Sequence, residues 1–160
     1  MSTATFTRTS DTELVITRTF RAPPHRVYEV WTNPTHVAAW WAPASHGCAV
    51  ASAVAEVAVG GAYRYVTRVA SGDEFAFIGT YLELSPPTRI VYTQTFEPMA
   101  HLGEAVVTVT FDAQPDGTTF MRSVERYPSK DVLDGALASG MESGARETMD
   151  QLDAIAAALG

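Results

Sequence analysis

The sequence predicts an α+β fold in which an antiparallel sheet curls around one long C-terminal helix. Three observations predict it. From residue 49 to residue 126, apolar side chains recur with a period of two, and turns rich in glycine and proline interrupt them. From Leu133 to Leu159, apolar residues recur at spacings of three and four, as in an amphipathic helix. Between residues 24 and 40, two short segments have helical spacing and are flanked by prolines.

The N-terminal part of the chain begins with a polar segment, residues 1–12, which we expect to be loose. The first strand is predicted over residues 13–21, where apolar residues share one parity and Arg18 interrupts them. Pro24 suits the first turn of a helix, and the Asn33-Pro34 pair separates that helix from a second one over residues 35–40. One strand followed by two short helices is therefore expected here.

Six further strands and a long helix are predicted to follow. The strands span residues 49–58, 62–69, 74–84, 89–96, 105–111 and 118–126. Ser129 is a suitable N-cap for the helix, because its hydroxyl can accept a hydrogen bond from a free backbone N–H. If this helix continued to Leu159 without a break, it would be on the order of 45 Å long at about 1.5 Å per residue.

The composition of the chain limits its function. A length of 160 residues fits one domain, residues 1–160. The net charge of −7 and the scattered lysines and arginines exclude a nucleic-acid partner. No segment reaches the roughly 18 apolar residues of a membrane span, and the N-terminus has no apolar signal region, so we expect no membrane partner and a cytoplasmic location. The four histidines lack metal-ligand spacing, and we expect neither a metal nor a cofactor.

An ordered set of segments resembles the SRPBCC (START-related, birch-pollen-allergen-like) superfamily, and within it the activator-of-heat-shock-90-ATPase homologues. The matching segments are FRAPPHRVYEVWTNPTHVAAWWAP (20–43), GGAYRYV (60–66), GTYLELSPPTRIVYT (79–93), VTVTF (107–111), YPSKD (127–131) and GMESGARETMDQLDAI (140–155). The resemblance implies the helix-grip fold, a seven-stranded antiparallel sheet that wraps a long C-terminal helix, with an apolar cavity between them. The superfamily includes ligand carriers, receptors, polyketide cyclases and co-chaperone domains, so it does not determine the function.

Strand parity and this implied cavity give a set of expected ligand contacts. They are Trp40, Trp41, His46, Tyr63, Tyr65, Phe77, Tyr81, Tyr92, Phe96, Met141, Ala145 and Met149. We expect the two tryptophans to close one end of the cavity. Four tyrosine hydroxyls that converge on an apolar space would suit a phenolic or polyketide-like ligand, although aromatic residues that only pack a core would show the same pattern.

Two positions leave alternatives open. Where relatives commonly have tryptophan or another large residue, this chain has Ala145, with Gly140 and Gly144 beside it. These small residues either widen the cavity or allow close backbone packing. Arg122 lies in the middle of the last strand, and we expect it to point outward, because an inward arginine would need a carboxylate or an anionic ligand.

Three functions are compatible with this reading. The first is binding of a small hydrophobic, aromatic or polyketide-like molecule in the internal cavity, by a monomer or a homodimer. The second is a cyclase or dehydratase, which would require an inward titratable group with a shifted pKa. The third is a co-chaperone-type interaction domain, which would require an exposed charged groove, and the scattered charges of the sequence do not indicate one.

Overall fold

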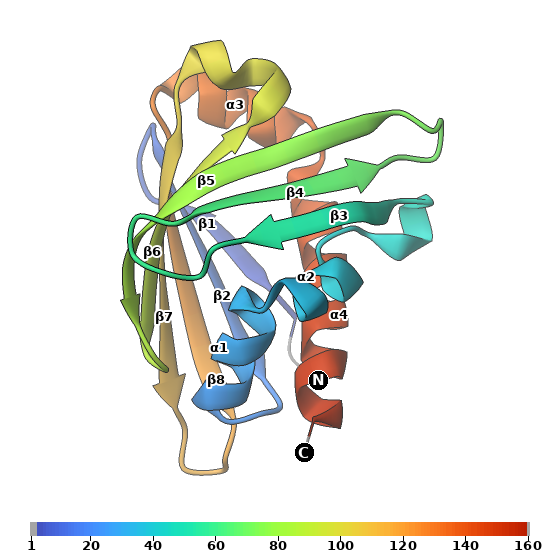
Figure 1. Ribbon diagram of the computed structural model, residues 1–160. Helices are drawn as coiled ribbons and strands as arrows, with labels where there is room; N and C mark the ends of the chain where they lie inside the picture. Colours follow the sequence, from blue (N-terminus) through green and yellow to red (C-terminus); the bar gives the residue numbers. More distant parts are fainter. Residues whose placement is uncertain (1–2, 160) are drawn as a thin grey trace.

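A computed structural model describes residues 3–159. Within them, one antiparallel sheet has the strand order β1-β2-β8-β7-β6-β5-β4-β3 (Figure 1). The strands are β1 (Thr5–Arg8), β2 (Glu13–Phe20), β3 (Ala49–Ala55), β4 (Ala62–Arg68), β5 (Glu74–Ser85), β6 (Arg89–Phe96), β7 (Ala105–Ala113) and β8 (Thr119–Arg126). The helices are α1 (Pro24–Thr32), α2 (Pro34–Trp40), α3 (Lys130–Ala138) and α4 (Met141–Ala158), with short 3-10 turns η1 (Ala44–His46) and η2 (Glu97–Leu102).

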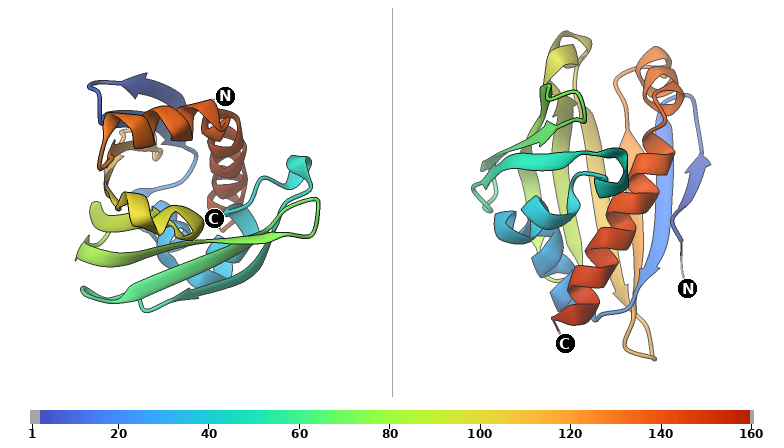
Figure 2. Two further views of the ribbon diagram at one scale, coloured as in Figure 1. Left: turned by 90° about the horizontal axis from the view of Figure 1, so that it is seen from above. Right: turned by 90° about the vertical axis from the view of Figure 1, so that its right-hand side faces the viewer.

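The sheet curves strongly, and α4 runs along its open side (Figure 2). α4 packs on α1, α2 and β2, and α2 packs on β3, so the helices connect the two ends of the curved sheet. This is the helix-grip arrangement, and it confirms the predicted fold class. The two short helices also lie where the proline signals predicted them, with Pro24 and Pro34 in their first turns.

The N-terminal segment differs from the expectation of a loose chain. Residues Thr5–Arg8 form β1, which pairs with β2 and gives the sheet an eighth strand. The Arg146 guanidinium lies 4.9 Å from the centre of the Phe6 ring, and Arg8 Nη1 lies 2.6 Å from Asp134 Oδ1. Contacts with distant parts of the chain hold this strand, and its own short polar sequence could not predict them.

The predicted single C-terminal helix is two helices. α3 ends at Ala138 and α4 begins at Met141, and Gly140 between them has φ +82°. This left-handed backbone conformation ends a helix and favours glycine. The apolar stripe continues through the break, so hydrophobic periodicity alone did not reveal it. α3 consequently lies at the same end of the sheet as η2, while α4 runs along the sheet (Figures 1 and 2).

A buried ion-pair network joins β2 to α4 and accounts for the arginine in the apolar face of β2. Arg18 is only 4% exposed, and its Nη1 lies 2.6 Å from Asp150 Oδ1. Asp153 is 3% exposed. Its carboxylate accepts hydrogen bonds from the backbone N–H of Arg21 at 2.8 Å and from Arg21 Nε at 2.7 Å, and it lies 3.6 Å from Arg18 Nη2. The charges of β2 therefore fix the position of the long helix.

Candidate functional site: an apolar cavity lined by a half-buried carboxyl

A cavity of about 520 Å³ lies between η2, α3, the start of α4 and strands β5 to β8. Most of its wall is apolar. The sheet contributes Phe77, Gln94, Thr95, Phe96, Ala105, Val107, Glu125 and Tyr127, and the helical segments with their flanking residues contribute Met99, Leu102, Gly103, Pro128, Asp131, Val132, Gly135, Ala136, Ser139 and Met141. The break at Gly140 brings α3 and the start of α4 to the same cavity.

Glu125 is the distinctive polar group of this wall. It lies near the end of β8, and Tyr127 Oη donates a hydrogen bond to Glu125 Oε1 at 2.7 Å. Within residues 3–159 this is its one hydrogen bond, and no ion pair reaches it. Burial raises the pKa of the Glu125 carboxyl, and the Tyr127 hydrogen bond offsets part of this rise. The cavity therefore contains a carboxyl without a cationic partner.

Sequence reasoning missed Glu125, although strand parity contained the signal. Arg122 is exposed, as expected. If Arg122 points outward, then Met121, Ser123 and Glu125 share the opposite parity and point inward. Met121 and Ser123 are indeed buried. A carboxylate in the penultimate position of a strand is commonly at the surface, so the parity argument was not extended to Glu125.

Three of the twelve expected ligand contacts, Phe77, Phe96 and Met141, line this cavity. Trp41 lies next to the wall, because its ring centre is 5.7 Å from that of Phe77. Trp40 is buried in the core, where its indole N–H donates to the Val30 carbonyl at 2.8 Å. Ligand contact by the other expected residues stays a prediction.

The four tyrosines form a packed cluster. Tyr63 lies 4.8 Å from Tyr65 and 5.7 Å from Tyr81, measured between ring centres, and Tyr92 joins them at 5.8 Å from Tyr63. Tyr63 Oη donates to the Thr93 carbonyl at 2.7 Å, and the hydroxyls of Tyr65 and Tyr81 are 3.4 Å apart. Burial raises the pKa of all four hydroxyls, which keeps them neutral. None of the four is among the residues that line the cavity.

The remaining expected contacts lie along α4 and next to it. His46 Nδ1 is 3.2 Å from Glu147 Oε1, and the Ser45 backbone N–H donates to Glu147 Oε2 at 2.6 Å, so this group fastens η1 to α4. A Cβ on Gly144 would lie 3.9 Å from Pro43, and Gly140 forms the helix break. Met149 is buried and Ala145 is half-buried on α4, and neither lines the cavity. Of the small residues here, Gly140 has a clear structural role, because it ends α3 in the left-handed conformation.

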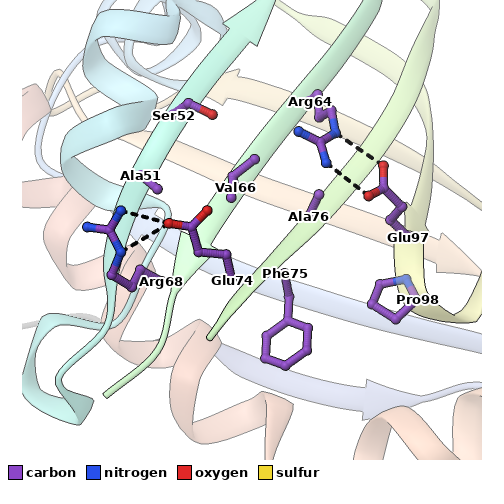
Figure 3. Close-up of a pocket in the computed structure, with 10 residues that line it drawn as sticks. All are labelled: Ala51, Ser52, Arg64, Val66, Arg68, Glu74, Phe75, Ala76, Glu97 and Pro98. Atoms are coloured by element: carbon purple, nitrogen blue, oxygen red, sulfur yellow. Dashed lines mark hydrogen bonds and ion pairs between the residues drawn. The ribbon is translucent and has the colours of Figure 1, made fainter. Parts of the chain in front are cut away.

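A second hollow lies on the outer face of β3, β4 and β5, and its side chains are charged (Figure 3). The sequence did not indicate such a surface. Arg64 pairs with Glu97 at 2.9 Å, and Arg68 pairs with Glu74 at 2.7 Å. Because these four charges neutralise one another in pairs, the hollow has no unpaired charge to offer a partner.

Comparison with models of protein families shows which family the chain belongs to. The family described as Activator of Hsp90 ATPase homolog 1-like protein matches residues 21–157. The chain belongs to this family. The matched region of the chain includes the whole cavity wall. Among the curated proteins, none matches the chain. No helix within residues 3–159 is long and apolar enough to cross a membrane.

Solved structures share the fold of this protein over nearly the whole chain. A protein from Rhodobacter sphaeroides is 25% identical with a TM-score of 0.86, covering 98% of this chain and 99% of that one. A protein from Chromobacterium violaceum is 28% identical with a TM-score of 0.79, covering 92% and 99%. An HSP90 activator from Plasmodium falciparum is 19% identical with a TM-score of 0.58, covering 73% and 74%, and this likeness shows the fold alone.

Replacing Glu125 with glutamine is expected to change how stability depends on pH. A raised pKa means that the folded state holds this proton more tightly than the unfolded chain does, for which the ordinary value is 4.5. The wild-type carboxyl therefore contributes stability below its ordinary pKa and loses that contribution as the pH rises through the raised value. Glu125→Gln should become progressively more stable than wild type across this window, as measured by melting temperature against pH.

Exposed Glu104 provides the control for this experiment. Glu104→Gln removes the same charge outside the cavity wall, and its melting temperature should follow the wild-type pH profile. Two parallel profiles for wild type and Glu125→Gln would contradict the expected effect. The groups that interact with Glu125 are the hydroxyls of Tyr127, Tyr92 and Tyr63, each with its own raised pKa, so they remain neutral over this range.

A ligand in the cavity is expected to quench the fluorescence of Trp41 rather than that of Trp40. Trp41 touches the wall residue Phe77, whereas Trp40 packs against Trp31 in the core at 5.7 Å between ring centres. Trp41→Phe should remove most of the quenching on titration with a neutral apolar probe, and Trp40→Phe should retain it. Equal quenching in both variants would show that Trp41 does not report on the cavity.

Proposed function

We propose that the protein binds a small hydrophobic, aromatic molecule in the cavity between η2, α3 and the sheet. The observation that carries this proposal is a hollow of about 520 Å³ with a mostly apolar wall. Ligand sites in proteins have this character, with volumes of roughly 300–1,000 Å³ and a few polar groups that orient the ligand. The aromatic rings of Phe77 and Phe96 support an aromatic ligand, because their centres lie 5.1 Å apart on one wall.

The residues of η2 support a route into the cavity. Met99 and Leu102 line the cavity and are nevertheless 52% and 43% exposed. Flexible apolar side chains at a solvent boundary adapt to ligands of different shape. On the opposite side, Gly135 of α3 has no atom within 4 Å of where a Cβ would be, so this part of the wall is open. A ligand would enter between η2 and α3.

The test is a fluorescence titration with N-phenyl-1-naphthylamine, an uncharged apolar probe at neutral pH. The wild-type protein should bind it with enhanced emission. Ala136→Trp should abolish binding, because Ala136 lines the cavity and the indole would fill it. Ala138→Trp is the matched control, since Ala138 lies two residues further along the same helix, is exposed and does not line the cavity. Equal binding by the two folded variants would reject the proposal.

One observation favours acid–base catalysis as a second candidate function. Glu125 is an inward titratable group with a raised pKa, the feature expected of an enzyme of cyclase or dehydratase type. Native mass spectrometry of protein purified from its own host separates the two functions. A retained molecule in Glu125→Gln that the wild type holds only as a product lighter by one water would support a dehydratase. The same retained mass in both proteins would support binding alone.

A further inference from the structure

We propose that the ligand of this cavity carries a protonated amine on its apolar body, and that the Glu125 carboxylate is the anchor for that amine. This inference rests on the proposed binding function and specifies its ligand class. It starts from the lack of a cationic partner for Glu125. Buried charges in proteins are normally paired, and here Tyr127 supplies one hydrogen bond to one carboxylate oxygen. The other oxygen is available to a ligand.

The charge of the wall favours a cation over an anion. The described residues that line the cavity include two carboxylates, Glu125 and Asp131, and no lysine, arginine or histidine. An anionic ligand would therefore meet only like charges, with nothing to compensate its desolvation. A cationic ligand would form an ion pair with Glu125 inside the protein, where screening by water is weak.

The aromatic wall supports the same ligand class. Phe77, Phe96 and Tyr127 line the cavity together with Glu125. The faces of aromatic rings attract cations, and this attraction grows when the site is desolvated. The thioethers of Met99 and Met141 complete a polarizable surface for the apolar part of the ligand. The same wall thus accommodates both the hydrocarbon body and the ammonium group.

Binding of an ammonium ion has a defined proton balance. Below the raised pKa of Glu125, the free protein holds a proton on this carboxyl. The amine arrives already protonated, so the carboxyl must release its proton to solvent when the ion pair forms. Neutral Tyr63 of β4, Tyr92 of β6 and Tyr127, directly after β8, interact with Glu125, and Asp131 on α3 is exposed. None of these groups supplies a positive charge that would replace the amine.

The experiment compares three probes of nearly equal shape by isothermal titration calorimetry: 2-naphthylmethylamine, 2-naphthylmethanol and 2-naphthoate. Wild-type protein should bind the amine about tenfold or more tightly than the alcohol, as expected for a hydrogen bond between charged groups, and the carboxylate most weakly. Glu125→Gln should lose the preference for the amine and retain the alcohol. Glu104→Gln, with the same change in net charge on an exposed residue, should retain the wild-type preference.

A second measurement needs the wild-type protein alone. Titration of the amine in two buffers with different ionisation enthalpies should show proton release that grows as the pH is lowered through the raised pKa of Glu125, and the alcohol should show none. If all three probes fail to bind, the proposed binding function fails. If the alcohol binds as tightly as the amine, or if Glu125→Gln keeps the wild-type preference for the amine, the cavity is a ligand site but the amine assignment is wrong.

Discussion

Asp153→Ala is expected to lower the free energy of unfolding by about 3–5 kcal/mol, the usual cost of leaving a buried charge without its partner. Asp153 is 3% exposed and accepts two hydrogen bonds from Arg21, while the neighbouring Arg18 is 4% exposed. Removing this carboxylate leaves the backbone N–H of Arg21 without its acceptor and takes one of two acidic partners from Arg18. Urea denaturation would measure the loss.

Asp150 gives the matched control, because it binds the same Arg18 from a side chain that is 59% exposed. Asp150→Ala should cost less than Asp153→Ala, because Asp153 then keeps its two hydrogen bonds from Arg21 and still lies 3.6 Å from Arg18. A similar loss of unfolding free energy in both variants would mean that the burial of Asp153 does not determine its contribution to stability. The comparison also tests whether this network fastens α4 to β2.

Gly79→Ala is expected to destabilise the protein by roughly 3 kcal/mol, at the upper end of the usual cost of overpacking. A Cβ on Gly79 would collide with the carbonyl oxygen of Thr93 and with the ring of Tyr63. Because the Tyr63 hydroxyl donates to that same carbonyl, the substitution would separate β5 from β6 or displace the tyrosine. Thermal unfolding with circular dichroism detection would measure the effect.

The same substitution at Gly135 should have the opposite sign. Gly135 lies inside α3, and a Cβ there would meet no atom within 4 Å. Alanine favours a helix over glycine by about 1 kcal/mol, so Gly135→Ala should raise the melting temperature. A loss of stability at both positions would show that backbone freedom, rather than space, determines the result at Gly79.

Most of the fold could be predicted from the sequence because strands and turns have local signals. Alternation and turn residues placed β2 to β8, and proline placed α1 and α2. β1 could not be predicted in this way, because contacts with Arg146 and Asp134, far along the chain, stabilise it. The helix break could not be predicted from the apolar stripe, because it depends on the backbone conformation of Gly140.

The site was predicted less well than the fold. Parity determines the face of the sheet on which a side chain lies, but not its position along a curved strand relative to the helices. The tyrosines are on the expected face and fill its centre by packing on one another. The cavity therefore lies towards η2 and α3, where Phe77 and Phe96 were predicted contacts and Glu125 was not. Only the curvature of the sheet and the direction of α3 reveal that location.

The turn at Gly140 has a consequence for the size of the cavity. An unbroken helix over residues 130–158 would extend for about 44 Å in one direction and carry Ala136 and Ser139 away from the sheet. In this protein the volume of the cavity depends on the angle between α3 and α4 at the Gly140 turn. A different angle at this turn would therefore change the volume of the cavity, and with it the size of the ligand that fits, without replacing any residue of the wall.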